Sequence, residues 1–492
     1  MPAPLAAFLV VLSSAAVLVL EVLVSRLVAP YVGLTLETYT AAIGVALAAI
    51  AAGAAAGGRL ADAVDPRRWL GPAVALGGAL LLAARPTVFA IGDGFRGTGP
   101  VGTVLLVALA VGPSALLLST VTPGVVKLRL RTLAETGQTV GRLSAAGTLG
   151  ALAGTFLTGF VLLAALPTST LLLLTGLVLV LTGLVVAVAL PRVVRPLPLA
   201  GVVTLAALTA GWLVVADSTC QVETRYYCAT VTKDPARDSG RTLVLDGLRH
   251  SYVDLDDPAY LQFAYTRRIA DVLAAQPPGP LDVLHLGGGG FSVPRHLEAV
   301  RPGSRSTVLE VDPQIPDIGR DFLGLVTGAD LAVVVGDART SIARQSSGSY
   351  DVVVGDAFGS LAVPWHLTTA EMVAEVRRVL RPGGVYVLNI IDNPPLAFAR
   401  AETATLLAAF DDVALMALPA ALRGDAGGNL VLVGSDRPLP VDRLGVLAAD
   451  RGEPDSVLDR AGVVAFAGDA DVLTDDDAPV DQLLTPYAPP TA

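Results

Sequence analysis

The residues Leu281-Asp-Val-Leu-His-Leu-Gly287-Gly-Gly-Gly290 indicate the fold that we expect for the second half of the chain. Its first six residues are mostly Leu and Val, which predicts a strand buried on both faces. The glycine run that ends the strand lets the backbone approach a ligand without obstruction by side chains. A helix containing residues 294–300 follows, so the stretch is typical of a strand, a tight turn and a helix.

The same alternation of strand and helix continues toward the C-terminus. Further strands are predicted at residues 307–312, 331–335, 350–355 and 384–391, with a helix at 369–380 before the last of them. Such alternation predicts a doubly wound, Rossmann-like α/β sheet with a ligand crevice at the carboxyl ends of its strands. We expect this α/β domain to span residues 258–492.

Acidic residues stand at the ends of three of these strands. Glu310 follows Gly287 at about the spacing of an acid that accepts hydrogen bonds from both ribose hydroxyls. Asp337 could accept from an adenine amino group, and Asp356 ends the next strand. There is no Walker A lysine, and Ser292 fills the last glycine position of G-x-G-x-x-G, so ATP and NAD are poor candidates. The crevice therefore predicts a nucleoside site, and a cationic sulfonium nucleoside suits its acidity.

The first half of the chain is predicted to be a membrane domain. The whole sequence is 53% hydrophobic and only 16% charged, against roughly 25% charged residues in soluble domains. This excludes an all-soluble enzyme, a disordered protein and a nucleic-acid binder with a basic surface. Apolar runs long enough to cross a bilayer lie at 5–29, 38–60, 69–92, 100–122, 143–165, 169–190 and 198–216. We expect about seven helices over residues 1–216, with the lipid bilayer as a partner.

Glycine pairs one helical turn apart predict close packing between these helices. The pairs are Gly53 with Gly57 and Gly150 with Gly154. Small residues at this spacing let two backbones approach where lipid provides no hydrophobic driving force.

Loop charge predicts the orientation of the chain. Within residues 1–216, nine Lys and Arg residues fall in one set of loops, and the other set carries only Arg26, Arg85 and Arg96. The positive-inside rule then places the N-terminus inside, and seven spans place the C-terminal half outside. One span more or fewer would reverse that last step.

A β-rich junction is predicted at residues 217–257, with strands at 242–246 and 251–255. It begins with the two cysteines of the chain, Cys220 and Cys228. A hairpin would bring them within the distance of a disulfide, which persists in an oxidising compartment and so agrees with an extracytoplasmic location. The alternative is a pair of unbonded small apolar residues.

Taken together, these motifs resemble the polyamine aminopropyltransferases, or spermidine synthases. The resemblance covers roughly residues 220–484, and the ending Leu473–Leu484 is similar to the tail of the branch fused to an N-terminal multi-pass membrane domain. It implies a class I methyltransferase-type fold with a small N-terminal β subdomain. The shared motifs are Leu245-Asp246-Gly247, Tyr260, Gly287–Gly290, Val308–Pro313, Gly336-Asp337-Ala338, Tyr350–Asp356 and Leu380–Gly384.

The resemblance also implies roles for individual residues. Asp356 would be the general base, and it would bind the acceptor amine together with Tyr260 and His250. The nucleoside would lie against Gly287, Gly288, Gly289, Gly290, Glu310, Asp337 and Ala338. The co-substrate would be decarboxylated S-adenosylmethionine, with no tightly bound cofactor and no metal. The acceptor would be a polyamine such as putrescine, nucleic acid would not bind, and the chain would form a homodimer.

This sequence departs from the family pattern mainly where the amine binds. The acid of the family's glycine loop is replaced by Gly290, and the active-site loop after Asp356 carries Gly359 in place of a further acid. His250 replaces a glutamine. The nucleoside half of the motif set is therefore better preserved than the amine half.

Two alternatives stay open. The chain could be an S-adenosylmethionine-dependent methyltransferase-like enzyme, since that class shares the nucleoside site. It could instead be a non-catalytic protein that binds or transports a nucleoside or polyamine. Sulfonium nucleosides are made in the cytosol, which conflicts with a transferase domain on the outside. The conflict disappears if the span count is off by one, if the substrate is delivered through the membrane domain, or if the domain no longer catalyses.

Overall fold

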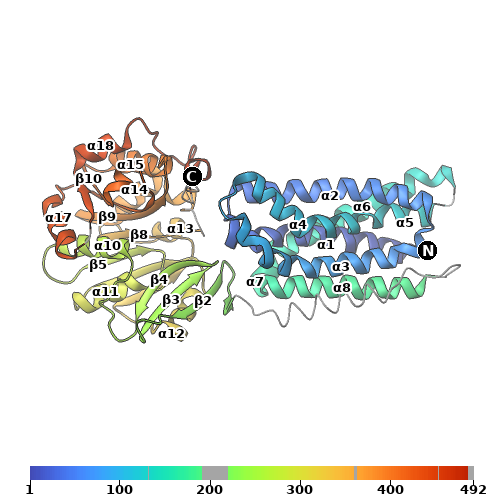
Figure 1. Cartoon of the computed structure of the whole chain (residues 1–492), viewed down its shortest axis with the longest axis horizontal. Coiled ribbons are helices and arrows are strands. Elements are labelled where there is room, and N and C mark those ends of the chain that lie inside the picture. Colours follow the sequence, from blue (N-terminus) through green and yellow to red (C-terminus); the bar gives the residue numbers. More distant parts are fainter. Residues whose placement is uncertain (131, 191–219, 360–362, 453, 486–492) are drawn as a thin grey trace. The chain divides into compact units, whose positions relative to one another are not determined.

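The computed structural model describes residues 1–130, 132–190, 220–359, 363–452 and 454–485 (Figure 1). The chain divides into two compact units, Met1–Thr219 and Cys220–Ala492. The expected domain boundary at residue 216 and the expected seventh span at 198–216 both lie outside the described residues.

The N-terminal unit is a bundle of apolar helices. Six of its segments are long and apolar enough to cross a membrane: Ala3–Val32, Leu36–Ala63, Pro66–Phe95, Gly99–Arg129, Leu133–Ala165 and Thr168–Ala189. They match the first six expected spans, including the third, which contains Arg85 and Pro86. The helices are α1 (Ala3–Val32), α2 (Leu36–Ala63), α3 (Pro66–Ile91), α4 (Gly99–Ser119), α5 (Val121–Arg129), α6 (Thr136–Phe156), α7 (Leu163–Ala165) and α8 (Thr168–Ala189), joined in part by η1 (Gly92–Phe95), η2 (Leu133–Glu135) and η3 (Leu157–Leu162).

Glycines bring helix backbones into direct contact in this unit. A Cβ atom built on Gly53 of α2 would lie 2.2 Å from the carbonyl oxygen of Leu116 in α4. One built on Gly150 of α6 would lie 2.5 Å from the carbonyl oxygen of Val11 in α1. Neither approach is compatible with a side chain, so the predicted close packing at the two glycine pairs is confirmed.

The C-terminal unit begins with a four-stranded antiparallel sheet of order β1-β2-β3-β4. The strands are β1 (Val222–Glu223), β2 (Cys228–Lys233), β3 (Gly240–Leu245) and β4 (Leu248–Asp254). Asp246 and Gly247 form the tight turn between β3 and β4, both with positive φ, 51° and 78°. This sheet is the predicted small β subdomain.

An eight-stranded mixed sheet forms the rest of the unit, in the order β12-β10-β11-β9-β8-β5-β6-β7. Its parallel strands are β5 (Asp282–Leu286), β6 (Arg305–Glu310), β7 (Leu331–Val335), β8 (Tyr350–Gly355) and β9 (Leu380–Asp392), and its antiparallel strands are β10 (Asp412–Ala417), β11 (Gly428–Ser435) and β12 (Ser456–Leu458). The strand order reverses between β5 and β8, which is where a doubly wound sheet opens its crevice. The predicted doubly wound fold is confirmed, with three antiparallel strands added at one edge.

Helices cover both faces of this sheet (Figure 1). In β9, Tyr386, Leu388 and Ile390 belong to the core on one face, whereas Val385 and Val387 belong to the core on the other. This alternation explains the apolar sequence of the central strands, because neither face of them meets water. Four helices pack on one face: α13 (Ala338–Ile342), α14 (Ala370–Val379), α15 (Ala397–Ala409) and α18 (Arg460–Ala467). Three helices pack on the other face: α10 (Ala264–Ala275), α11 (Ser292–Val300) and α17 (Val441–Asp450). The remaining helices are α12 (Ile315–Phe322), η4 (Trp365–Leu367), α16 (Pro419–Leu422) and α19 (Val480–Leu483).

Candidate functional site

A cavity of about 860 Å³ lies at the carboxyl ends of β5, β6 and β8, and the small sheet and the start of α10 complete its wall. It brings together most of the residues that the sequence singles out. Those lining it are His250, Gly287, Gly288, Gly289, Glu310, Asp337, Ala338 and Asp356. Two predicted residues, Tyr260 and Gly290, lie outside the lining.

The glycine turn after β5 is shaped by close backbone contacts. Gly287 has φ +94°, and a Cβ atom there would lie 2.5 Å from the carbonyl oxygen of Asp356. The ends of β5 and β8 therefore approach each other across a position that only glycine can fill. Gly289 also has positive φ, +48°, so the turn presents bare backbone to the cavity.

Glu310 is anchored by backbone amides at the end of β6. Its Oε2 accepts a hydrogen bond of 2.8 Å from the N–H of Gly288, and its Oε1 accepts one of 2.9 Å from the N–H of Asp312. Burial raises the pKa of Glu310, and these backbone hydrogen bonds oppose that rise. The backbone of Gly289 is hydrogen-bonded to the same carboxylate. Since an ionised carboxylate has about four acceptor positions, the remaining acceptor capacity could serve a ribose hydroxyl.

Asp337 is held in a similar way at the first turn of α13. Its Oδ1 accepts from the N–H of Thr340 at 3.1 Å, and its Oδ2 lies 2.9 Å from Nε2 of His366. Ala338, the next residue, is buried beside it. His366 also lines the cavity. No local pattern marks it as a neighbour of Asp337, because it lies far along the chain in η4.

Asp356, at the end of β8, is held by side chains. Its Oδ1 accepts from Nδ2 of Asn389 at 2.8 Å, and its carboxylate is also hydrogen-bonded to Tyr265. Asn389 Oδ1 in turn accepts from Nδ2 of Asn429 at 3.0 Å. Burial raises the pKa of Asp356 to about 6, although these hydrogen bonds lower it in part. A carboxyl with this pKa is suited to exchange protons near neutral pH.

A buried ion pair supports this chain of amides from outside the cavity. The guanidinium of Arg268 in α10 donates to the backbone carbonyl of Asn429 at 2.9 Å and to both carboxylate oxygens of Asp455, at 2.6 and 2.9 Å. The side chains of Arg268 and Asp455 are almost fully buried. Asn429 is thus fixed on the side away from Asp356.

His250 of β4 lies in the wall beside Tyr227. Their ring centroids are 6.3 Å apart, and burial lowers the pKa of His250 to about 4. The imidazole is therefore neutral at pH 7. The Tyr227 hydroxyl donates to the backbone carbonyl of Phe358 at 2.9 Å, which ties the small sheet to the loop that follows Asp356.

Tyr260 packs away from the cavity, contrary to its expected place in the amine site. The centroid of its ring lies 5.8 Å from the ring centroid of Tyr252 and 4.0 Å from Cζ of Arg237. Its hydroxyl bonds to Gln262. These contacts hold the side chain on the outer surface of the small sheet's connection to α10.

Gly290 is also outside the lining, because Ser251 covers it. The Gly290 N–H donates to Ser251 Oγ at 2.8 Å. A Cβ atom at Gly290 would lie 2.7 Å from the Cβ atom of Ser251. The space that an acidic side chain at position 290 would need is therefore already filled.

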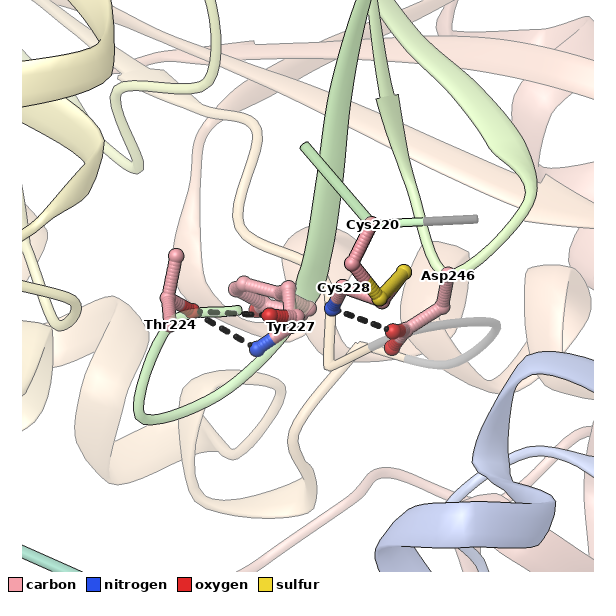
Figure 2. Close-up of a disulfide and its surroundings, with 5 residues drawn as sticks. All are labelled: Cys220, Thr224, Tyr227, Cys228 and Asp246. Carbon is pink, nitrogen blue, oxygen red and sulfur yellow. Dashed lines mark hydrogen bonds between the residues drawn. A yellow bond between two sulfur atoms is a disulfide. The ribbon is translucent and has the colours of Figure 1, made fainter. Parts of the chain in front are cut away.

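A disulfide joins Cys220 and Cys228 at the start of the unit (Figure 2), with Cα atoms 5.0 Å apart. The predicted pairing is confirmed and the alternative of two unbonded cysteines is excluded. Within the loop that it closes, Thr224 Oγ1 accepts from the N–H of Tyr227 at 2.8 Å, and the N–H of Cys228 donates to Asp246 at 2.8 Å. The disulfide thus closes the segment that places Tyr227 in the cavity wall.

No group of three or more His, Cys, Asp or Glu side chains in the described part of the chain is arranged to hold a metal ion.

Comparison with known proteins gives consistent matches to one family. Residues 262–400 match the family model described as a spermine/spermidine synthase domain. A polyamine aminopropyltransferase of Chromobacterium violaceum is 30% identical over 139 residues, which is 28% of this chain and 53% of the relative. One from Vibrio vulnificus is 30% identical over 182 residues, 37% of this chain and 58% of the relative. The chain spans about half the length of these curated relatives.

A solved structure also resembles the chain. It is described as a probable spermidine synthase from Corynebacterium glutamicum, is 30% identical, and superposes with a TM-score of 0.49. The match covers 52% of this chain and 95% of that chain.

Proposed function

Because the C-terminal unit belongs to the spermine/spermidine synthase family, we propose that it transfers an aminopropyl group from decarboxylated S-adenosylmethionine to the nitrogen of an amine. The resemblance supplies putrescine as the first acceptor to test. The observation that carries the proposal is the position of Asp356, whose carboxyl has a pKa raised to about 6 and shares one cavity with Glu310 and Asp337. The apolar helices of the N-terminal unit would hold this transferase at a membrane.

Asp356 would act on the proton of the amine. An alkylamine is protonated at neutral pH and its ammonium form has no lone pair to attack with. The Asp356 carboxylate binds the ammonium and accepts its proton while the nitrogen forms a bond to the carbon beside the sulfonium. The carbon–sulfur bond breaks, its electron pair goes to sulfur, and the neutral thioether 5′-methylthioadenosine leaves.

The nucleoside end of the cavity positions the donor. Glu310 would accept hydrogen bonds from the ribose, Asp337 with Ala338 would meet the adenine, and the glycine turn would lie against the alkyl chain. The sulfonium is already a good leaving group, so positioning and charge placement would supply most of the catalysis.

The test uses the full-length chain in detergent micelles or nanodiscs. Calorimetry with 5′-methylthioadenosine measures binding at the nucleoside end, and mass spectrometry of reactions with the donor and an amine detects the aminopropylated product. Binding with product formation supports the proposal. Absence of both overturns it, whereas binding without product from any amine would show a non-catalytic nucleoside-binding protein.

A methyltransferase-like reaction with S-adenosylmethionine is a second candidate, favoured by the contact between Gly290 and Ser251. Without an acid at position 290, the described lining has no carboxylate on the glycine turn for the terminal ammonium of the decarboxylated donor. Comparing the affinities of the two nucleosides separates the candidates. Tighter binding of the carboxylated form would favour methyl transfer.

The C-terminal unit is proposed to lie outside the cytoplasm. The concentration of Lys and Arg in one set of loops supports this orientation, as does the disulfide between Cys220 and Cys228. A membrane-impermeant thiol reagent should label intact cells only after a reductant has been added. Labelling that requires cell lysis would place the unit inside. A homodimer remains a prediction, checked by the molar mass of the purified protein.

A further inference from the structure

The cavity wall beside Asp356 is aromatic and ends in an arginine. The Asp356 carboxylate is hydrogen-bonded to Tyr265, whose ring centroid lies 6.1 Å from that of Phe263. The guanidinium of Arg249 lies 5.2 Å from the centroid of the Phe263 ring. All four side chains line the cavity. A chain of contacts therefore leads from a carboxylate, across two rings, to a cation.

The other two carboxylates of the described lining are engaged at the nucleoside end. Glu310 accepts hydrogen bonds from the backbone N–H groups of Gly288 and Asp312. Asp337 accepts one from the N–H of Thr340 and is paired with Nε2 of His366. Among the described lining residues, Asp356 is therefore the carboxylate that faces the aromatic wall. The sequence from residue 357 to residue 370 contains no acid, so the loop after Asp356 adds none.

Arg249 is the charged side chain of the described lining at the far end of this wall. Asp234, which interacts electrostatically with Arg249, lies outside the lining. An acceptor whose nitrogen reaches Asp356 would extend along Tyr265 and Phe263 toward the guanidinium. The second ammonium of a diamine would then approach a like charge, which is unfavourable. A carboxylate at the same position would form a charge-assisted, bidentate pair with the guanidinium.

Resting on the proposed aminopropyl transfer, we propose that the acceptor of this chain is an aminocarboxylate, with its amine at Asp356 and its carboxylate at Arg249. The reaction at nitrogen is unchanged: an N–C bond forms, the C–S bond breaks with its electron pair on sulfur, and the proton goes to Asp356. The carboxylate takes no part in bond making and serves only for recognition.

A matched series of four-carbon acceptors tests this assignment. The full-length chain is assayed at saturating donor with 4-aminobutanoate, butylamine and 1,4-diaminobutane, and kcat/KM is measured for each. We expect 4-aminobutanoate to exceed 1,4-diaminobutane by about tenfold or more, as for a charge-assisted contact. If butylamine or the diamine is the best of the three, the inference is wrong and the proposed transfer stands. If none of the three gives product but another amine does, the inference is wrong and the proposed transfer stands; if no amine gives product, both fail.

Substitution of Arg249 provides the second arm. Arg249→Gln should lower kcat/KM for 4-aminobutanoate about tenfold, mainly through KM, and leave butylamine almost unchanged. Arg249→Glu should reverse the order in favour of 1,4-diaminobutane. Arg344→Gln, at an exposed arginine outside the cavity, is the matched control, and unchanged affinity for 5′-methylthioadenosine shows that each variant is folded. A preference that is the same in Arg249→Glu as in the unaltered chain would overturn the assignment.

Discussion

The two ends of the cavity hold their carboxylates by different means. At the end proposed for the nucleoside, Glu310 and Asp337 accept hydrogen bonds from the backbone amides of Gly288, Asp312 and Thr340. Asp337 also lies 2.9 Å from the His366 side chain, whereas Glu310 is held by backbone amides. At the acceptor end, Asp356 is held by the side chains of Asn389 and Tyr265. Backbone donors persist as long as the fold persists, whereas side-chain donors change with a single substitution. The position of Glu310 is therefore set by the backbone, whereas that of Asp356 depends on two side chains that single substitutions can change.

The largest expected effect is that of Asp356→Asn at the acceptor end. Loss of the general base should lower kcat by about 10²–10⁴-fold, while the affinity for 5′-methylthioadenosine stays the same. Steady-state kinetics and calorimetry check the two halves of this expectation. Asp330→Asn, at an exposed position outside the cavity, is the control. Equal turnover in both variants would remove Asp356 from the mechanism.

The same variant has an effect on stability whose sign follows from the pKa. The folded-state pKa of Asp356, about 6, lies above its ordinary value of 3.8, so folding favours the protonated carboxyl. The stability that this group contributes is complete below pH about 4 and is lost as the pH rises through 6. Asp356→Asn should therefore unfold at a higher temperature than the unaltered chain at pH 8, with the difference vanishing at low pH. Thermal unfolding as a function of pH measures this.

The next effect in size is that of Glu310→Gln at the nucleoside end. The amide group of glutamine would direct an N–H toward a backbone N–H that now donates to the carboxylate. We expect the Kd for 5′-methylthioadenosine to rise about 10–100-fold, with a smaller change in kcat at saturating donor. Glu298→Gln, on the exposed side of α11, is the matched control. Unchanged affinity in Glu310→Gln would mean that the ribose binds elsewhere.

A smaller effect should follow when the side chains that hold Asp356 are shortened. Asn389→Ala removes a hydrogen bond that lowers the pKa of Asp356, so the pH below which activity falls should move upward from about 6 by roughly one unit. Asn429→Ala should shift it in the same direction but less, because Asn429 acts through Asn389. The pH profile of kcat measures both shifts. A midpoint that does not move would show that the two amides have no influence on proton transfer.

The smallest effect is expected from Tyr227→Phe. This change removes only the hydrogen bond to the carbonyl of Phe358, worth about 1 kcal/mol, so KM for the acceptor should rise about threefold to fivefold. Reduction of the disulfide between Cys220 and Cys228 should change the same parameter, because it frees the segment that carries Tyr227. An effect confined to kcat would point to a different role for the ring.

Local patterns were sufficient to predict the central strands and to bring three acidic residues to one cavity. Glu310 ends β6, and Asp337 and Asp356 follow β7 and β8 closely. These strands run parallel in one sheet, with β5 between β6 and β8, so their carboxyl ends lie at the same edge. The six described spans were likewise predictable, because length and composition decide whether a helix can cross a bilayer. The seventh predicted span lies outside the described residues.

The residues that sequence reasoning missed come together only through long-range pairing. Asn389 and Asn429 lie on β9 and β11, which pair antiparallel, and no local pattern marks either amide as a neighbour of Asp356. Tyr260 lies outside the cavity lining for a related reason. A motif gives its position along the chain, but the contacts with Arg237 and Tyr252 determine the orientation of its ring. Contacts between residues far apart in the sequence are thus the ones that local patterns could not predict.

The contact between Gly290 and Ser251 couples these two positions to each other. A Cβ atom at position 290 would lie 2.7 Å from the Cβ atom of Ser251, so a side chain there would have to displace a residue of β4. The same displacement would disturb the hydrogen bond from the Gly290 N–H to Ser251 Oγ. Introducing an acid into the glycine turn therefore calls for a paired change at Ser251, and neither position can be redesigned alone.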